Sequence, residues 1–240
     1  MRQSAQWVIR AAVMGLAMIG GATSSLAQTY DLSSISNNEK LIFGNYTLTS
    51  VGNDLGCSHT NSNGFSATCR NSEVVGTIHR GVLSLVFQTI PGSGSAALAS
   101  ATAGYSGTMD FAFNVSEKIG NTIIPISQVA LGITTKSCAG TSCGSTDLAS
   151  ITAKETVNNA SSPQLSVSGA SQNDGPVSVT GNSLSISKAL AISNPSGSGV
   201  TLSLLTMTQR YYGAPEPISL SVFGAGLAGL ALVRRKFRRA

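Results

Sequence analysis

The two histidines are the side chains of this chain best suited to acid–base chemistry near neutral pH. His59 follows Cys57 by two residues in a segment rich in Ser and Asn, and His79 directly precedes Arg80. A Ser-His-Asp hydrolase holds its histidine between a nucleophile and an acid, and no G-x-S-x-G nucleophile motif occurs in the chain. We therefore expect both histidines to be structural or solvated rather than catalytic.

The acidic residues are scattered singly along the chain, so no carboxylate pair is visible in the sequence. Glycosidases bring two carboxylates together in space, which sequence spacing does not exclude. Asp110 is the acid of most interest, but it falls on the polar side of an alternating segment. The pairs Asn53-Asp54 and Asn173-Asp174 are too sparse for a calcium loop. We predict no catalytic, cofactor-binding or metal residues, and a glycan-active enzyme remains the alternative.

Four cysteines, Cys57, Cys69, Cys138 and Cys143, lie in one central part of the chain. An even number of cysteines in an exported chain indicates disulfides. Three pairings are possible, of which the local pairs, Cys57 with Cys69 and Cys138 with Cys143, are favoured. The spacings do not give the paired C-x2-C knuckles of a zinc site, and no histidine lies near the second pair.

A G-x-G-x-x-G pattern is present at residues 224–229. This pattern binds dinucleotides only where it follows a strand and opens a helix within a βαβ unit. Here it lies in an apolar segment near the end of the chain, so we regard it as a false match. Ser221, Ala225 and Gly229 recur at a spacing of four, which would give a membrane helix one smooth face for close packing. That face could meet an enzyme, a second copy of itself or only lipid.

The elements that must position these side chains show the period of β-strands. Apolar residues alternate with polar ones in many short segments, as half-buried strands require. The clearest runs are Met109, Phe111, Phe113 and Val115; Leu83, Leu85 and Phe87; Val129, Leu131 and Ile133; Val177 and Val179; Leu184 and Ile186; and Val200, Leu202 and Leu204. No segment of the body has a sustained helical stripe.

Clusters of Gly, Pro and Asn separate these runs and predict turns. They lie at residues 91–94, 173–176, 181–182 and 194–197, and residues 95–104 could add a helical turn. Residues 29–40 are polar and are expected to be a flexible lead-in. We predict an all-β chain whose body, residues 28–213, is an antiparallel β-sandwich of jelly-roll type.

The first 27 residues have the pattern of a signal peptide. Arg2 and Arg10 precede a short apolar stretch at residues 11–21. Ser25-Leu26-Ala27 then places small residues before a cleavage site between Ala27 and Gln28. The apolar stretch is shorter than the roughly 20 residues that a membrane-spanning helix needs. We therefore expect export rather than a first membrane span.

The net charge of +5 does not indicate a nucleic-acid partner. Seven of the fifteen basic residues lie in the first 27 and the last seven residues, whereas residues 28–233 contain eight basic and ten acidic residues. The exported body is thus close to neutral, and a role in nucleic-acid binding is rejected.

The last 26 residues form a three-part tail. Pro215-Glu216-Pro217 is followed by an apolar run at residues 218–233, predicted to be a transmembrane helix, and then by the basic cluster Arg234, Arg235, Lys236, Arg238 and Arg239. Basic residues stay on the cytoplasmic side of a membrane segment, so they would anchor the topology. The prolines on both sides of Glu216 disfavour helix and would keep the motif extended and accessible. Tyr211 and Tyr212, just before the tail, either lie at the membrane interface or end the last strand.

The motif, the spanning segment and the basic cluster lie within residues 214–240. Together they resemble the PEP-CTERM sorting signal of Gram-negative bacteria. The resemblance implies processing by an exosortase, a membrane-embedded cysteine transpeptidase that acts near the motif. It also implies an inner-membrane-anchored precursor that is then transferred to the cell surface or the extracellular matrix, in association with polysaccharide and biofilm. Residues 188–192 and 203–211 also loosely resemble the last strands of other exosortase-dependent surface domains.

The expected function is that of a non-enzymatic surface or matrix protein whose polar sheet face or loops contact polysaccharide. Two alternatives stay open: a secreted or surface glycan-active enzyme, and a single-pass membrane protein that is never processed. Two carboxylates, or His79 with an acid, gathered in one concave site would favour the enzyme.

Overall fold

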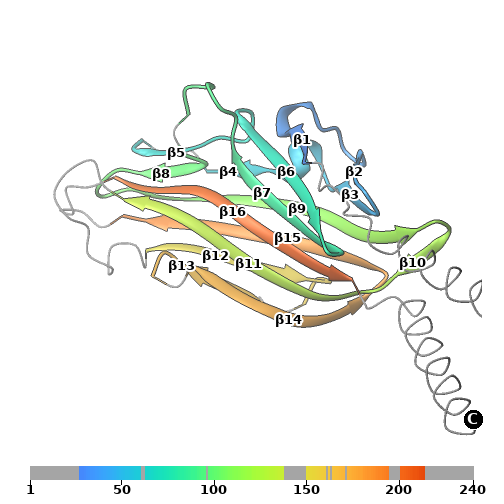
Figure 1. The fold of residues 1–240 in the computed structure, drawn as a ribbon. Helices are drawn as coiled ribbons and strands as arrows, with labels where there is room; N and C mark the ends of the chain where they lie inside the picture. Colours follow the sequence, from blue (N-terminus) through green and yellow to red (C-terminus); the bar gives the residue numbers. More distant parts are fainter. Residues whose placement is uncertain are drawn as a thin grey trace, which may run out of the picture.

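The structure, a computed structural model, describes residues 27–60, 63–95, 97–137, 150–160, 162, 164–170, 172–194 and 201–213. Within these residues the chain is built almost wholly from antiparallel strands (Figure 1). Its helical content there is two short 3-10 helices, η1 (Leu32–Ser34) and η2 (Asn53–Gly56). The prediction of an all-β, antiparallel body is confirmed.

The strands form two sheets. Sheet A comprises β1 (Gln28–Asp31), β5 (Phe65–Ala67), β6 (Ser72–His79), β7 (Val82–Thr89), β8 (Ala99–Ala101), β11 (Ile126–Ser137), β14 (Asn173–Gly181) and β16 (Leu202–Gly213). Sheet B comprises β2 (Lys40–Phe43), β3 (Tyr46–Ser50), β4 (Ser58–His59), β9 (Ser106–Ile119), β10 (Thr122–Ile124), β12 (Ile151–Val157), β13 (Leu165–Ser168) and β15 (Ser183–Ser193).

The strand order places the last strand in the middle of its sheet. Sheet A follows the order β1-β6-β7-β16-β11-β14, with β8 also paired to β16 and β5 to β8. Sheet B follows the order β13-β12-β15-β9-β3-β2, with β4 and β10 also paired to β9. From β11 onward the chain changes sheet repeatedly, so strands that are neighbours in the sequence often face each other across the core (Figure 1).

One apolar core fills the space between the sheets, and the alternating residues build it. Met109, Phe111, Phe113 and Val115 are buried on β9, as are the predicted inward residues of β7, β11 and β15. Phe87 of sheet A lies with its ring centroid 5.0 Å from that of Phe111 in sheet B. Val177 and Val179 are only half-buried, because β14 is the edge strand of sheet A. The period of two therefore identified the faces of these strands correctly.

Three local predictions are wrong. Residues 29–40 are not a flexible lead-in, because β1 pairs with β6 and the side chains of Leu32 and Ile35 are buried in the core. The cluster Asn173-Asp174-Gly175-Pro176 is not a turn between strands but the start of β14. Residues 99–101, where a helical turn was considered, form strand β8.

The first and last described strands lie next to the predicted signal peptide and the predicted sorting tail. Gln28 is the first residue of β1. Tyr211 and Tyr212 belong to the last strand, β16, and the side chain of Tyr211 is fully buried in the core, so Tyr211 is not an interface residue. In the part of the chain that the structure describes, no helix has the length and apolarity to cross a bilayer. The predicted signal peptide and the sorting tail lie outside the described residues, except for Ala27.

Candidate functional site

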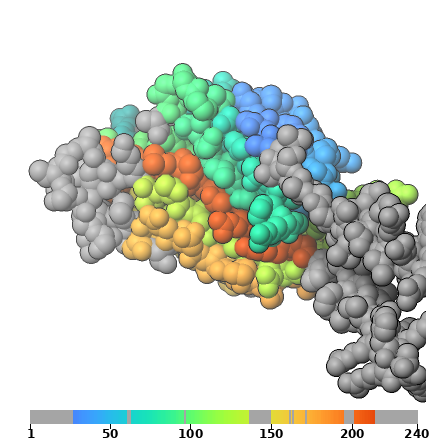
Figure 2. All heavy atoms as spheres, in the orientation of Figure 1, coloured from blue at the N-terminus to red at the C-terminus, as the bar shows by residue number. Residues whose placement is uncertain are grey.

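The outer face of sheet A carries a shallow trough over three adjacent strands, β16, β11 and β14. Figure 2 views the molecule from this side, where the three strands lie next to one another. The trough encloses about 480 Å³, which is within the size range of ligand sites. Its lining residues come from three parts of the chain: 130–134, 172–176, and the alternate positions Thr208, Arg210 and Tyr212.

Small residues on the central strand form the floor of the trough. Side chains of β11 alternate between the two faces, so Leu131 and Ile133 are buried in the core while Ala130 and Gly132 lie between them in the sequence. In the sheet, Ala130 is opposite Arg210, and Gly132 is opposite Thr208 on one side and Asn173 on the other. On the outer face, larger side chains of β16 and β14 thus flank Ala130 and Gly132 of β11, and the small size of these two residues leaves the hollow.

Two glycines border this floor, and the backbone requires glycine at one of them, Gly175. A side chain at Gly132 would place its Cβ 2.8 Å from Oδ1 of Asn173, so the amide occupies the space above the glycine. Gly175 has a φ of +97°, and a Cβ there would meet the backbone of Val129 at 2.9 Å. The pairing of β11 with β14 shifts register at this point, as in a β-bulge. The cluster that resembles a turn is therefore the bulge that shapes one wall.

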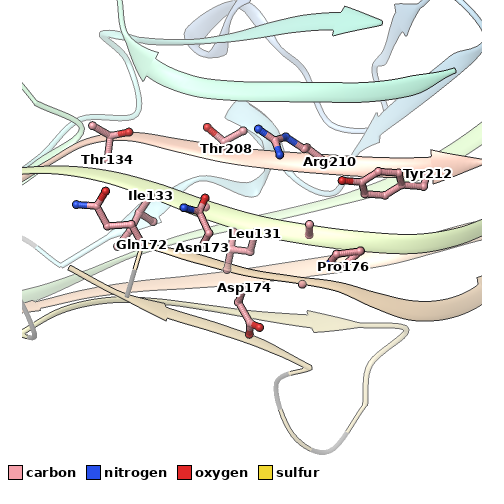
Figure 3. Close-up of a pocket in the computed structure, with 13 residues that line it drawn as sticks. Leu131, Ile133, Thr134, Gln172, Asn173, Asp174, Pro176, Thr208, Arg210 and Tyr212 are labelled. Carbon is pink, nitrogen blue, oxygen red and sulfur yellow. The ribbon is translucent and has the colours of Figure 1, made fainter. Parts of the chain in front are cut away.

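The trough offers hydrogen-bonding groups beside an aromatic ring (Figure 3). Arg210 is exposed and supplies guanidinium donors, Asn173 and Gln172 supply amides, and Tyr212 supplies a half-buried ring. Within the described residues the structure forms an ion pair only between Lys188 and Glu155, so Arg210 keeps its donors available.

Among the residues that the structure describes, a single carboxylate lines the trough. It belongs to Asp174, whose Oδ2 accepts a hydrogen bond from the backbone N–H of Ser166 at 2.7 Å. That contact links the edge strands β14 and β13 of the two sheets. No histidine is among the lining residues. The described lining residues therefore do not include the paired carboxylates, or the histidine with an acid, that hydrolysis of a glycan would need.

The residues considered for catalysis lie outside the trough. His59 and Asp110 are on paired strands, β4 and β9, but His59 is opposite Met109, and it is Ser58 that is opposite Asp110. His59 lies on β4, where its Nδ1 is 3.5 Å from Sγ of Cys69, and His79 is exposed at the end of β6. Asp110 is half-buried on β9, and burial raises the pKa of its carboxyl. Across the described ranges, no group of three His, Cys, Asp or Glu side chains is placed to hold a metal ion.

One of the two predicted disulfides is present. Cys57 is bonded to Cys69, with a Cα–Cα distance of 5.8 Å, and the bond closes the loop that contains β4 and β5. Cys138 and Cys143 lie outside the described residues. The same holds for the sorting motif Pro215, Glu216 and Pro217 and for the basic cluster at its end.

A second polar site lies inside the core and was missed by the sequence reasoning. Glu155 of β12, Lys188 of β15 and Gln209 of β16 are each at most 1 % exposed. Nζ of Lys188 donates hydrogen bonds to Oε2 of Glu155 and to Oε1 of Gln209. Nε2 of Gln209 in turn donates to Oε1 of Glu155 at 3.0 Å. The three side chains form a closed ring of contacts between the two sheets.

Apolar neighbours surround this ring. Glu155 and Lys188 are direct cross-strand partners in sheet B, and Phe111 is the partner of Lys188 on its other side. Gln209 in sheet A lies between Leu85 and Leu131. Burial raises the pKa of Glu155 and lowers that of Lys188, so the desolvated pair is shifted toward its neutral, carboxyl–amine form.

The sequence does contain a signal for this ring. On β15 the inward positions read Leu184, Ile186, Lys188, Leu190 and Ile192, so a lysine occupies a core position of an otherwise apolar face. Glu155 follows Ile151 and Ala153 in the same way on β12. A charged residue in register with a buried face is a candidate for a paired, functional group.

Comparison with known proteins gives no family and no relative: no protein-family model matches the chain, and neither a curated protein nor a solved structure matches it significantly.

Proposed function

We propose that this chain is an exported, non-enzymatic surface or extracellular-matrix protein that binds polysaccharide through the trough on sheet A. Its route is that of a PEP-CTERM protein: a signal peptide directs export, the tail holds an inner-membrane precursor, and an exosortase processes it at Pro215-Glu216-Pro217. The observation that carries the binding proposal is the trough itself, with an aromatic ring, a free guanidinium and two amides around a flat floor.

The chemistry of the trough fits a carbohydrate chain. A sugar ring presents C–H groups that pack on an aromatic face, and hydroxyls that pair with amide and guanidinium groups. Tyr212 and Arg210 supply these two kinds of contact from one edge, and Asn173 supplies an amide from the other. The trough is partly open rather than fully enclosed, which lets a polymer extend beyond it on either side.

The alternative of a glycan-active enzyme has less support. Asp174 is the carboxylate that the described residues bring to the trough, and it already accepts a backbone hydrogen bond. Asp110 and His79 lie on other strands, β9 and β6.

The body of the protein is proposed to be a jelly-roll sandwich. Without the three-residue strands β8 and β10, eight strands follow one another from β7 to β16. Sheet A takes the first, eighth, third and sixth of them in that order, and sheet B the second, seventh, fourth and fifth. This is the strand order that two interlocked Greek keys produce, and it supports the jelly-roll assignment.

Sorting is tested by mass spectrometry of the C-terminus of the protein recovered from its own host. Loss of every residue beyond the motif is the expected result. An intact end at Arg239-Ala240 would instead indicate a single-pass membrane protein that is never processed.

Binding is tested by affinity electrophoresis of the protein through gels that contain alginate, an acidic polysaccharide, or dextran, a neutral one. Retardation in at least one gel is expected, and Tyr212→Ala and Arg210→Ala should each reduce it at least severalfold. Lys154→Ala is the matched control, because it removes an exposed charge from β12 in sheet B. Equal loss in the control, or no retardation in either gel, would contradict the assignment of the trough.

A further inference from the structure

We infer that the buried ring of Lys188, Glu155 and Gln209 is the site of a self-catalysed amide bond, in which the lysine side chain becomes joined to the glutamine side chain. The bond would link β15 of sheet B to β16 of sheet A through the middle of the core. This inference concerns a modification of the chain and does not depend on the sorting tail or on the trough.

The geometry supplies a nucleophile and an electrophile in contact. Nζ of Lys188 contacts Oε1 of Gln209, and the carbonyl carbon lies only about 1.2 Å from that oxygen. The hydrogen bond holds the amine beside the carbonyl, and a rotation of the Gln209 amide would bring Nζ over the face of the group from which an amine attacks. Both side chains are fully enclosed, so no water competes for the same carbon.

Glu155 is placed to move both protons that the reaction requires. One of its oxygens, Oε2, accepts from the attacking Nζ, and the other, Oε1, lies 3.0 Å from the leaving nitrogen Nε2 of Gln209. A single carboxyl can therefore accept a proton from the amine on one side and deliver a proton to the amide nitrogen on the other. Glu155 is left unchanged, which makes it the catalytic residue and Gln209 the electrophile.

The reaction balances without any further reagent. The bond between Nζ of Lys188 and Cδ of Gln209 forms, and the bond between Cδ and Nε2 of Gln209 breaks. One amine and one carboxamide give a secondary amide and one molecule of ammonia. No oxidant, metal or cofactor takes part.

The environment favours these reactants. An amine attacks only in its neutral form, and burial lowers the pKa of Lys188. A carboxyl donates a proton only when protonated, and burial raises the pKa of Glu155. A buried ion pair is costly to desolvate, whereas the product leaves a neutral amide in its place. The arrangement therefore has a physical reason to react that a surface Lys–Glu pair lacks.

Digestion with trypsin followed by mass spectrometry detects this bond. The enzyme cuts after Lys154, Lys188 and Arg210 in an unmodified chain, which gives the peptides 155–188 and 189–210. An amide on Lys188 blocks the middle cut, so both partners remain in one peptide, residues 155–210, whose mass is lower by one ammonia. The full chain is purified from an exporting host, unfolded, reduced and digested. The peptide is measured rather than the intact chain, because an N-terminal Gln28 can also lose ammonia on cyclising.

The expected result is that the ammonia-depleted peptide 155–210 replaces the two shorter peptides. In Glu155→Gln and in Gln209→Leu the two shorter peptides should return in full, whereas the control Lys118→Met should keep the linked peptide. Complete cutting after Lys188 in the unaltered chain would overturn the inference. A peptide lighter by one water instead of one ammonia would also overturn it, because the bond would then join Lys188 to Glu155. Both outcomes are read on the unaltered chain, so they do not depend on whether the variants fold.

Discussion

Two buried tyrosines give a prediction with opposite signs for the same substitution. Tyr46 of β3 and Tyr211 of β16 are each at most 1 % exposed. The hydroxyl of Tyr46 donates a hydrogen bond to the carbonyl oxygen of Gly81 at 2.7 Å, whereas the hydroxyl of Tyr211 has no hydrogen-bond partner in the described structure. Replacing each by phenylalanine removes one oxygen and leaves the ring in place.

The magnitudes follow from the partners of the two hydroxyls. Tyr46→Phe should lower the free energy of unfolding by about 1–1.5 kcal/mol, the net value of a hydrogen bond. Tyr211→Phe should raise it by about 1 kcal/mol, because an unpaired buried hydroxyl carries its desolvation cost without compensation. The two variants should therefore differ by about 2 kcal/mol, which exceeds the uncertainty of a comparison at matched slopes.

Urea unfolding at pH 7, monitored by far-UV circular dichroism, measures both effects. With a slope of roughly 2 kcal/mol per molar urea, the midpoints should move by about 0.5 M in opposite directions. A second readout is alkaline unfolding. Burial raises the pKa of both tyrosines, so the folded state holds these protons more tightly, and their contribution to stability is lost as the pH rises above the ordinary tyrosine value of about 10. If Tyr211→Phe lowers the stability as much as Tyr46→Phe does, the hydroxyl of Tyr211 is satisfied and the argument fails.

Two further predictions concern stability. The double variant Cys57→Ala, Cys69→Ala opens a loop with a sequence separation of 12, which should cost about 3 kcal/mol on the chain-entropy estimate and lower Tm by roughly 6–12 °C. The difference in Tm between this variant and the unaltered protein should shrink in reductant, and a Tm change below about 2 °C would contradict the estimate. Burial raises the pKa of Asp110, so its carboxyl costs stability as the pH rises from the unfolded-state value through the folded-state value. Asp110→Asn should raise Tm at pH 7 by on the order of 1 °C, a small effect because the side chain is only half-buried, and should leave Tm unchanged near pH 3, as scanning calorimetry at both pH values would measure.

The sequence was sufficient for the fold class because burial on one side of a strand leaves a period of two. The run from Met109 to Val115 shows this, since its apolar residues all lie in the core. It was not sufficient at Gly175, because a residue with positive φ serves a turn and a β-bulge equally well. Only the pairing of β14 with β11 distinguishes the two.

The trough could be predicted only as a polar sheet face. Gly132 and Arg210 are far apart in the sequence, and their closeness depends on the register between β11 and β16, with Ala130 opposite Arg210. Sequence periodicity states which face a residue is on but not which residue of another strand lies beside it. The buried ring was visible in principle, because Lys188 interrupts an apolar face, but its partner Gln209 again depends on how the sheets stack.

The position of β16 has a mechanical consequence. A pull on the chain beyond Gly213 acts along a strand that is bonded to β7 and β11 at once, so all these hydrogen bonds bear the load together in shear. A pull at the other end acts on β1, an edge strand with a single neighbour, which can be peeled away bond by bond. We therefore expect the folded body to resist force applied through Gly213 better than force applied through Gln28, and an amide between Lys188 and Gln209 would pass that force on to the opposite sheet.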